Sequence, residues 1–123
     1  MTAADALHDA PFRETAADVV VRRLEHGQYR GARGAAEALR RRAPGYPADV
    51  YDDALARLFA LYDDTVRTVR ASPLCSLSPS DGDAYAQAWA ETAEALASQH
   101  PDLTGPALPS TFLNWVHYWY CLR

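Results

Sequence analysis

The sequence predicts an all-α protein, a compact irregular bundle of about five helices. Alanine, leucine and arginine dominate the 123 residues, whereas valine and threonine are few, and this composition favours helix over sheet. Apolar residues recur at spacings of three and four along most of the chain, which is the period of an amphipathic helix. Prolines and glycines interrupt this pattern where helices would end.

The length predicts one helical domain covering residues 1–123, because domains typically run to about 100–150 residues. Residues 1–10 are polar and acidic without an apolar stripe, so we expect a flexible N-terminus. The net charge is −4, which excludes a basic field over the whole protein for nucleic acid or anionic lipid.

Two helices are expected first, over residues 12–26 and 29–43, as a local helical hairpin at residues 12–43. The first has an apolar stripe that begins at Phe12 and ends near Gly27; the second has a stripe made mostly of alanine and ends at Pro44.

The junction of this hairpin resembles a known repeat. Gly27, Tyr29 and Ala32, followed by Pro44, are similar to the second half of a tetratricopeptide repeat, in which such residues open the second helix and a proline closes the repeat. The similarity covers residues 27–44, and the pattern does not recur one repeat length later. We therefore interpret this segment as a generic helical hairpin, since a solenoid needs about three repeats.

The third helix is the longest, over residues 47–71. One face carries Tyr51, Leu55, Leu58, Tyr62, Val66 and Val69. Val50, Ala54, Phe59 and Leu61 widen that face beyond a coiled-coil seam, so we expect a central helix with neighbours on more than one side. Ser72 and Pro73 end it.

Two further helices complete the prediction. Ser80 to Asp83 resembles a capping box at the start of a helix that ends near residue 99. Ser110 is expected to cap a last helix over residues 111–122. Residues 72–79 and 102–109 are predicted to be short ordered connections.

The last predicted helix is unusually aromatic. It holds five of the thirteen aromatic residues, and Phe112, Trp115, Trp119 and Leu122 would share one face. One interpretation is that this helix packs into a groove of the bundle. The other is that it stays exposed and binds a protein partner or a second copy, a homodimer being the simplest form. The anchors would then be Trp115, Tyr118, Trp119 and Tyr120.

An alternative is a ligand or cofactor pocket, with or without catalysis. Its walls would be Trp89, Trp115, His117 and Cys121. His117 and Cys121 have the spacing of two metal ligands on one helix face, but no third ligand is near them in sequence. We therefore predict no metal and no cofactor.

A third interpretation rests on arginine. The basic candidates are Arg22, Arg23, Arg30, Arg33, Arg40, Arg41 and Arg42, against only two acidic residues in the same stretch. They could contact nucleic acid, but no aromatic residue beyond Tyr29 is interleaved with them for stacking on bases. The competing explanation is that this basic helix complements the acidic long helix across the surface. We do not expect a nucleic-acid partner.

The sequence lacks the motifs of common enzymes. It contains no nucleophile elbow, no glycine-rich phosphate loop and no His-Glu-x-x-His motif, so we predict no catalytic residues and lean against an enzyme. No signal pattern and no long apolar run is present, which predicts a cytoplasmic protein with no membrane partner.

Overall fold

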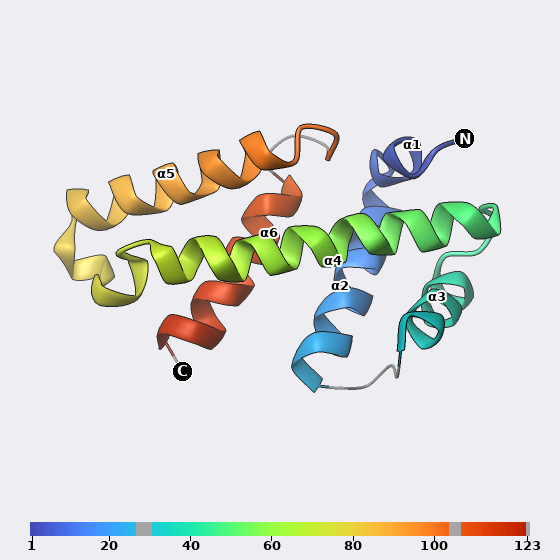
Figure 1. The fold of residues 1–123 in the computed structure, drawn as a ribbon, viewed down its shortest axis with the longest axis horizontal. Helices are drawn as coiled ribbons and strands as arrows, with labels where there is room; N and C mark the ends of the chain where they lie inside the picture. Colours follow the sequence, from blue (N-terminus) through green and yellow to red (C-terminus); the bar gives the residue numbers. More distant parts are fainter. Residues whose placement is uncertain (27–30, 104–106, 123) are drawn as a thin grey trace. The chain divides into compact units, whose positions relative to one another are not determined.

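The computed structural model describes residues 1–26, 31–103 and 107–122, without the side chains of residues 23–26, 31–33 and 107. Within these ranges the regular structure is entirely helical, with six α-helices and three short helical turns (Figure 1). The all-α prediction is confirmed. None of the helices in the described ranges has the length and apolarity needed to cross a membrane.

The chain divides into two compact units, Met1–Ala60 and Leu61–Arg123. Helix α4 (Ala48–Ala71) contributes its first half to one unit and its second half to the other. The single domain over residues 1–123 stays a prediction. Each unit has its own buried side chains and is described separately below.

The N-terminal unit begins with a short helix where the sequence predicts a flexible terminus. This helix, α1 (Ala3–Leu7), starts with a capping box: Thr2 Oγ1 accepts from the Asp5 amide at 3.1 Å, and Asp5 Oδ2 accepts from the Thr2 amide at 3.0 Å. These bonds lower the pKa of Asp5. Ala3, Ala6 and Leu7 are buried. Thr-x-x-Asp is itself a signal for a helix start, so the element was readable from the sequence.

The predicted hairpin at residues 12–43 is confirmed. Helix α2 (Ala10–His26) packs against α3 (Gly31–Arg42), and Ala35, Ala38 and Leu39 are buried in α3. The hydroxyl of Tyr51, from the first half of α4, donates to the carbonyl of Ala43 at 2.6 Å. It fastens the end of α3 to α4, because the last carbonyls of a helix lack partners inside the helix.

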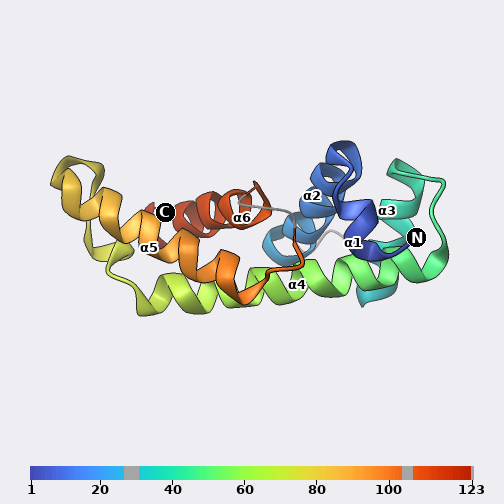
Figure 2. The same cartoon turned by 90° about the horizontal axis from the view of Figure 1, so that it is seen from above.

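The C-terminal unit consists of residues 61–71 of α4, α5 (Asp83–Gln99), α6 (Ala107–His117) and three turns. The turns are η1 (Leu74–Ser76), η2 (Pro79–Asp81) and η3 (Tyr118–Leu122), the last a π-helical turn. Helix α5 packs against α6, as both views show (Figures 1 and 2). The rings of Tyr62 and Phe112 meet edge to face at 5.8 Å, which fixes α6 to α4 within this unit.

Two predicted helix starts differ from the structure. The capping box expected at Ser80 lies instead at Ser78 and Asp81, which exchange bonds around η2, and Gly82 then leads into α5 with φ +62°. Helix α6 begins at Ala107 rather than at residue 111. It accommodates Pro109 because a proline in the first turn sacrifices no intrahelical hydrogen bond.

Candidate functional site

The predicted aromatic helix divides into a buried part and an exposed part. In α6, Phe112, Leu113 and Val116 are fully buried, as expected for a helix packed into a groove. In η3, Tyr118, Tyr120 and Leu122 are 54%, 44% and 60% exposed. Residues of α6 are therefore core, whereas residues of η3 lie at the surface; binding of a partner there stays a prediction.

The type of helix changes at the same place. A continuous α-helix would place Trp119 and Leu122 on the same face as Phe112. The chain changes to a π-helical turn after His117, and this turn winds more residues into each rotation. Of the residues predicted to share one face, Phe112 in α6 is buried and Leu122 in η3 is exposed.

Three aromatic rings line the junction of α6 and η3. Trp115 and Trp119 meet edge to face at 6.4 Å, and Tyr118 meets Trp119 at 6.0 Å. Both tryptophans are half-buried. Within the described part of the chain, no hydrogen-bond partner is found for the buried Nε1 of Trp115. All three tryptophans of the protein, these two and Trp89, belong to the C-terminal unit.

A cation lies on the exposed aromatic turn. The guanidinium of Arg70, near the end of α4, lies 5.0 Å from the ring centroid of Tyr120. Such a contact at the surface is worth about 0.5–1 kcal/mol. It places a positive charge and an aromatic face side by side, which are the two side-chain chemistries most enriched at binding hot spots.

His117 lies on the opposite side of α6, toward α5. It is 4% exposed, and the rings of Trp89 and Tyr85 meet it edge to face at 5.1 Å and 5.9 Å. Burial lowers the pKa of His117, because the charged imidazolium is poorly solvated there. The ring is therefore neutral near pH 7. Its Nε2 is buried and has no hydrogen-bond partner among the residues that the structure describes.

The alternative pocket residues take part in two ring contacts and one disulfide. Trp89 and His117 are in contact, whereas Trp115 pairs with Trp119. Cys121 is bonded through its sulfur to Cys75, so it offers no thiolate beside His117. Within residues 1–26, 31–103 and 107–122, no group of three metal-ligating side chains is gathered.

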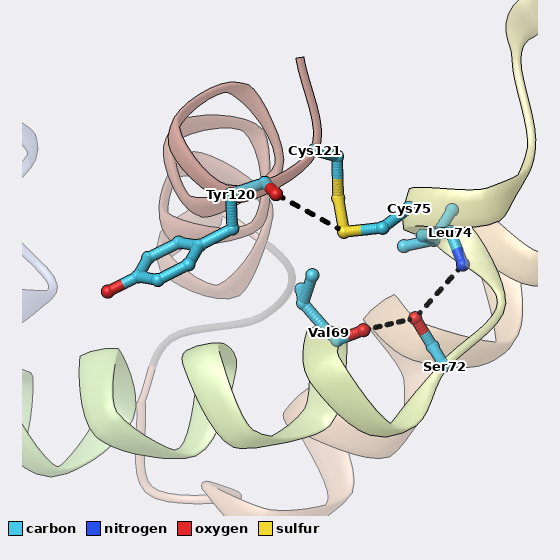
Figure 3. Close-up of a disulfide and its surroundings, with 6 residues drawn as sticks. All are labelled: Val69, Ser72, Leu74, Cys75, Tyr120 and Cys121. Atoms are coloured by element: carbon cyan, nitrogen blue, oxygen red, sulfur yellow. Dashed lines mark hydrogen bonds between the residues drawn. A yellow bond between two sulfur atoms is a disulfide. The ribbon is translucent and has the colours of Figure 1, made fainter. Parts of the chain in front are cut away.

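The disulfide Cys75–Cys121 is the principal feature that sequence reasoning missed. It joins η1 to η3 across a sequence separation of 46 residues (Figure 3). In the sequence, the presence of two cysteines was the one sign that a disulfide could form. The bond itself requires that α5 and α6 bring Cys121 close to Cys75 of η1, which the sequence does not show. Cys75 is exposed and Cys121 is half-buried.

Some of the basic candidates, the seven arginines between Arg22 and Arg42, contact other residues of the N-terminal unit. Arg22 and Arg42 both bind Asp18 of α2, at 2.9 Å and 2.7 Å. Partial burial acts to raise the pKa of Asp18, but the hydrogen bonds from Arg42 and Arg22 outweigh it and lower the pKa. Arg40 lies 5.7 Å from the ring of Tyr51.

Of the remaining four basic candidates, the structure describes the side chain of Arg41. Arg41 is exposed. Arg30 lies outside the described residues, as do the side chains of Arg23 and Arg33.

Two acidic residues of α4 pair with arginines of the same helix. Asp53 binds Arg57 at 3.2 Å, and Asp64 binds Arg67 at 2.7 Å. Asp64 also meets His100 Nε2 at 2.8 Å, which ties the end of α5 to α4.

Compared with protein-family models, with curated proteins and with solved structures, the chain matches none of them.

Proposed function

We propose that the protein is a small helical binding module that acts by protein–protein contact through its C-terminal aromatic segment. This segment consists of Trp115, Tyr118, Trp119, Tyr120 and Leu122. The observation that carries the proposal is the exposure of Tyr118, Tyr120 and Leu122 on one turn. Among the described residues, Met1 is the other large hydrophobic side chain with comparable exposure, so large apolar groups are concentrated on η3.

The partner that fits this segment most simply is a second copy of the chain. A twofold contact places the same patch on both sides, so each patch must complement itself. The segment offers aromatic faces on Tyr118 and Tyr120, and Arg70 of α4 places a guanidinium beside it, so these groups can exchange cation–π contacts across such an axis. Tyrosine and arginine also provide much of the binding energy in measured interfaces.

The test compares oligomeric states by native mass spectrometry and sedimentation velocity. Wild type is expected to form dimers, and the double variant Tyr118→Ala/Tyr120→Ala is expected to weaken association at least about tenfold, since each truncated hot spot costs about 1–2 kcal/mol. Both side chains are exposed, so the circular dichroism of the variant should be unchanged.

Glu94→Ala is the matched control, because Glu94 is exposed on α5 of the same unit and outside the segment. It should dimerise as wild type does. A wild type that remains monomeric at every concentration would show that self-association is wrong. Tyr118→Ala/Tyr120→Ala protein that dimerises normally would show that the contact lies elsewhere.

A second candidate function is ligand binding beside His117. It is favoured by one observation, the buried imidazole between Trp89 and Tyr85 with an unpartnered Nε2 among the described residues. A ligand hydroxyl or N–H at Nε2 would satisfy this atom. The same mass spectra test this candidate: a monomer that carries additional mass under native conditions, and loses it on denaturation, would favour ligand binding over association.

We also propose a cytoplasmic location, because the sequence shows no signal pattern and no long apolar run. In that compartment disulfides are rare, and those that form are usually transient or redox-sensing. The bond between Cys75 and Cys121 then needs an explanation other than permanent cross-linking.

A further inference from the structure

The two ends of the disulfide differ in how firmly the rest of the unit holds them. On one side, Leu74 of η1 is fully buried. Ser72 Oγ donates to the Val69 carbonyl at 2.8 Å and accepts from the Leu74 amide at 3.3 Å, as Figure 3 shows. Cys75 is therefore attached to a turn that is anchored to the end of α4.

The other end is held more weakly. None of the residues of η3 is buried, in contrast to the buried Val116 and His117 that precede it. Tyr120 receives the contact from Arg70, and Trp119 packs on Trp115 and Tyr118 of its own segment. A covalent bond to Cys121 thus restrains a turn that contributes no buried side chain to the unit.

The noncovalent link beside the bond is also weak. Cys75 Sγ lies 3.6 Å from the carbonyl oxygen of Tyr120 (Figure 3). A disulfide sulfur carries no hydrogen, so in the oxidised protein this is a contact without a donated proton. Once Cys75 is reduced, its thiol can donate to that carbonyl, but S–H is a weak donor.

We propose that Cys75–Cys121 is a thiol–disulfide exchange site for a small dithiol or a dithiol protein, and that its reduction releases η3 from η1. Cys75 is the more exposed residue of the pair, so we assign its sulfur as the point of attack. This inference rests on the proposed function only in its consequence for association, because η3 carries the proposed contact residues.

The exchange proceeds in two balanced steps. A thiolate of the dithiol attacks Cys75 Sγ and forms a mixed disulfide, and the bond to Cys121 breaks. The Cys121 sulfur leaves with the electron pair and takes a proton from water. The second thiol of the reductant then attacks its own sulfur in the mixed disulfide, and Cys75 leaves as a thiolate that is protonated in turn. The dithiol is oxidised by two electrons, and the protein disulfide becomes two thiols.

The test treats the folded full-length protein with dithiothreitol, without denaturant. Alkylation followed by mass measurement reports whether Cys75 and Cys121 become thiols. Hydrogen–deuterium exchange after a few seconds reports the order of each segment. Amide groups in Tyr118–Leu122 should exchange at least about tenfold faster after reduction, whereas α5 and the buried part of α6 stay protected at that time.

The double variant Cys75→Ser/Cys121→Ser is the matched control. It should show the fast exchange in η3 both with and without dithiothreitol, which separates loss of the bond from other effects of the reagent. Chymotrypsin should cleave after Tyr118 or Tyr120 faster in the reduced wild type than in the oxidised one.

Three outcomes would overturn the proposal. The first is a disulfide that is reduced only in denaturant, and the second is reduction that leaves exchange in η3 unchanged. The third is loss of protection in α5 and α6 together with η3, which would make the bond a structural cross-link. Association is measured separately by sedimentation of both redox forms. Release of η3 in a protein that is monomeric in either form supports the exchange site and rejects the proposed function.

Discussion

His117 shows how one residue can make the protein sensitive to acid. The pKa of its imidazole is lowered from 6.5 by burial, and in the unfolded chain the ring regains an ordinary pKa. Between these two pKa values the unfolded state binds more protons than the folded state. The contribution of neutral His117 to the free energy of unfolding is therefore fully present above about pH 6.5. It is lost as the pH decreases toward the pKa of the folded state.

We predict that His117→Phe removes this part of the acid sensitivity. Between about pH 7.5 and pH 5, wild type should lose more of its free energy of unfolding than His117→Phe does. Near neutral pH the variant should be as stable as wild type or more stable, because it loses an unpartnered buried nitrogen. Urea unfolding of both proteins at each pH gives the comparison, and parallel pH profiles would contradict the prediction.

Individual site residues were only partly predictable. Of the four predicted anchors, Tyr118 and Tyr120 are exposed, whereas Trp115 and Trp119 are half-buried. The spacing of His117 and Cys121 could not reveal that one sulfur bonds to Cys75, which depends on a contact between residues far apart in sequence. The use of these residues in binding stays a prediction.

At the scale of elements, the turn between η2 and α5 depends on Gly82. Its φ of +62° and ψ of −120° lie where a residue with a Cβ is strained, although a Cβ added at this position would have no atom within 4 Å of it. We predict that Gly82→Ala lowers the free energy of unfolding by about 1–3 kcal/mol through backbone strain alone. Urea unfolding measures the loss, and Glu94→Ala on the same helix should change stability by less than about 0.5 kcal/mol.

Helix positions were predictable wherever a proline or an apolar stripe defines them. The predicted helix over residues 47–71 agrees with α4, Ala48–Ala71, because Pro47 and Pro73 flank an unbroken stripe. Local signals failed where two were in competition. Ser78 and Ser80 each precede an aspartate by three residues, so the spacing does not distinguish them; the structure forms the box between Ser78 and Asp81. The π-helical turn at η3 has no comparable local signal.

For the whole molecule, the disulfide should stabilise one unit and not the other. It closes a span of 46 residues within Leu61–Arg123. The entropy of such a loop in the unfolded chain corresponds to about 4 kcal/mol. We predict that reduction lowers the unfolding free energy of this unit by up to that amount, measured by urea unfolding with and without dithiothreitol. Cys75→Ser/Cys121→Ser protein should match the reduced form and show no response to the reagent.

The grouping of the helices into two units was the least predictable aspect of the fold. Composition and periodicity identify helices, but each apolar stripe is compatible with several neighbours. The stripe of α4 continues from Tyr51 to Val69 without a break, and nothing in it marks the division between Ala60 and Leu61. Partner choice is set by contacts such as Tyr51 with Ala43 and Tyr62 with Phe112, which only the folded chain brings together.

The location of Trp89, Trp115 and Trp119 in one unit gives the protein an uneven optical signal. Tryptophan fluorescence, excited at wavelengths where tyrosine does not absorb, comes from the C-terminal unit alone. The far-ultraviolet circular dichroism, in contrast, sums the helices of both units. A melting curve recorded by emission is therefore the curve of residues 61–123. When the fluorescence melting curve is scaled and subtracted from the circular-dichroism melting curve, the remainder is the melting curve of the N-terminal unit. This needs neither a truncated chain nor a label.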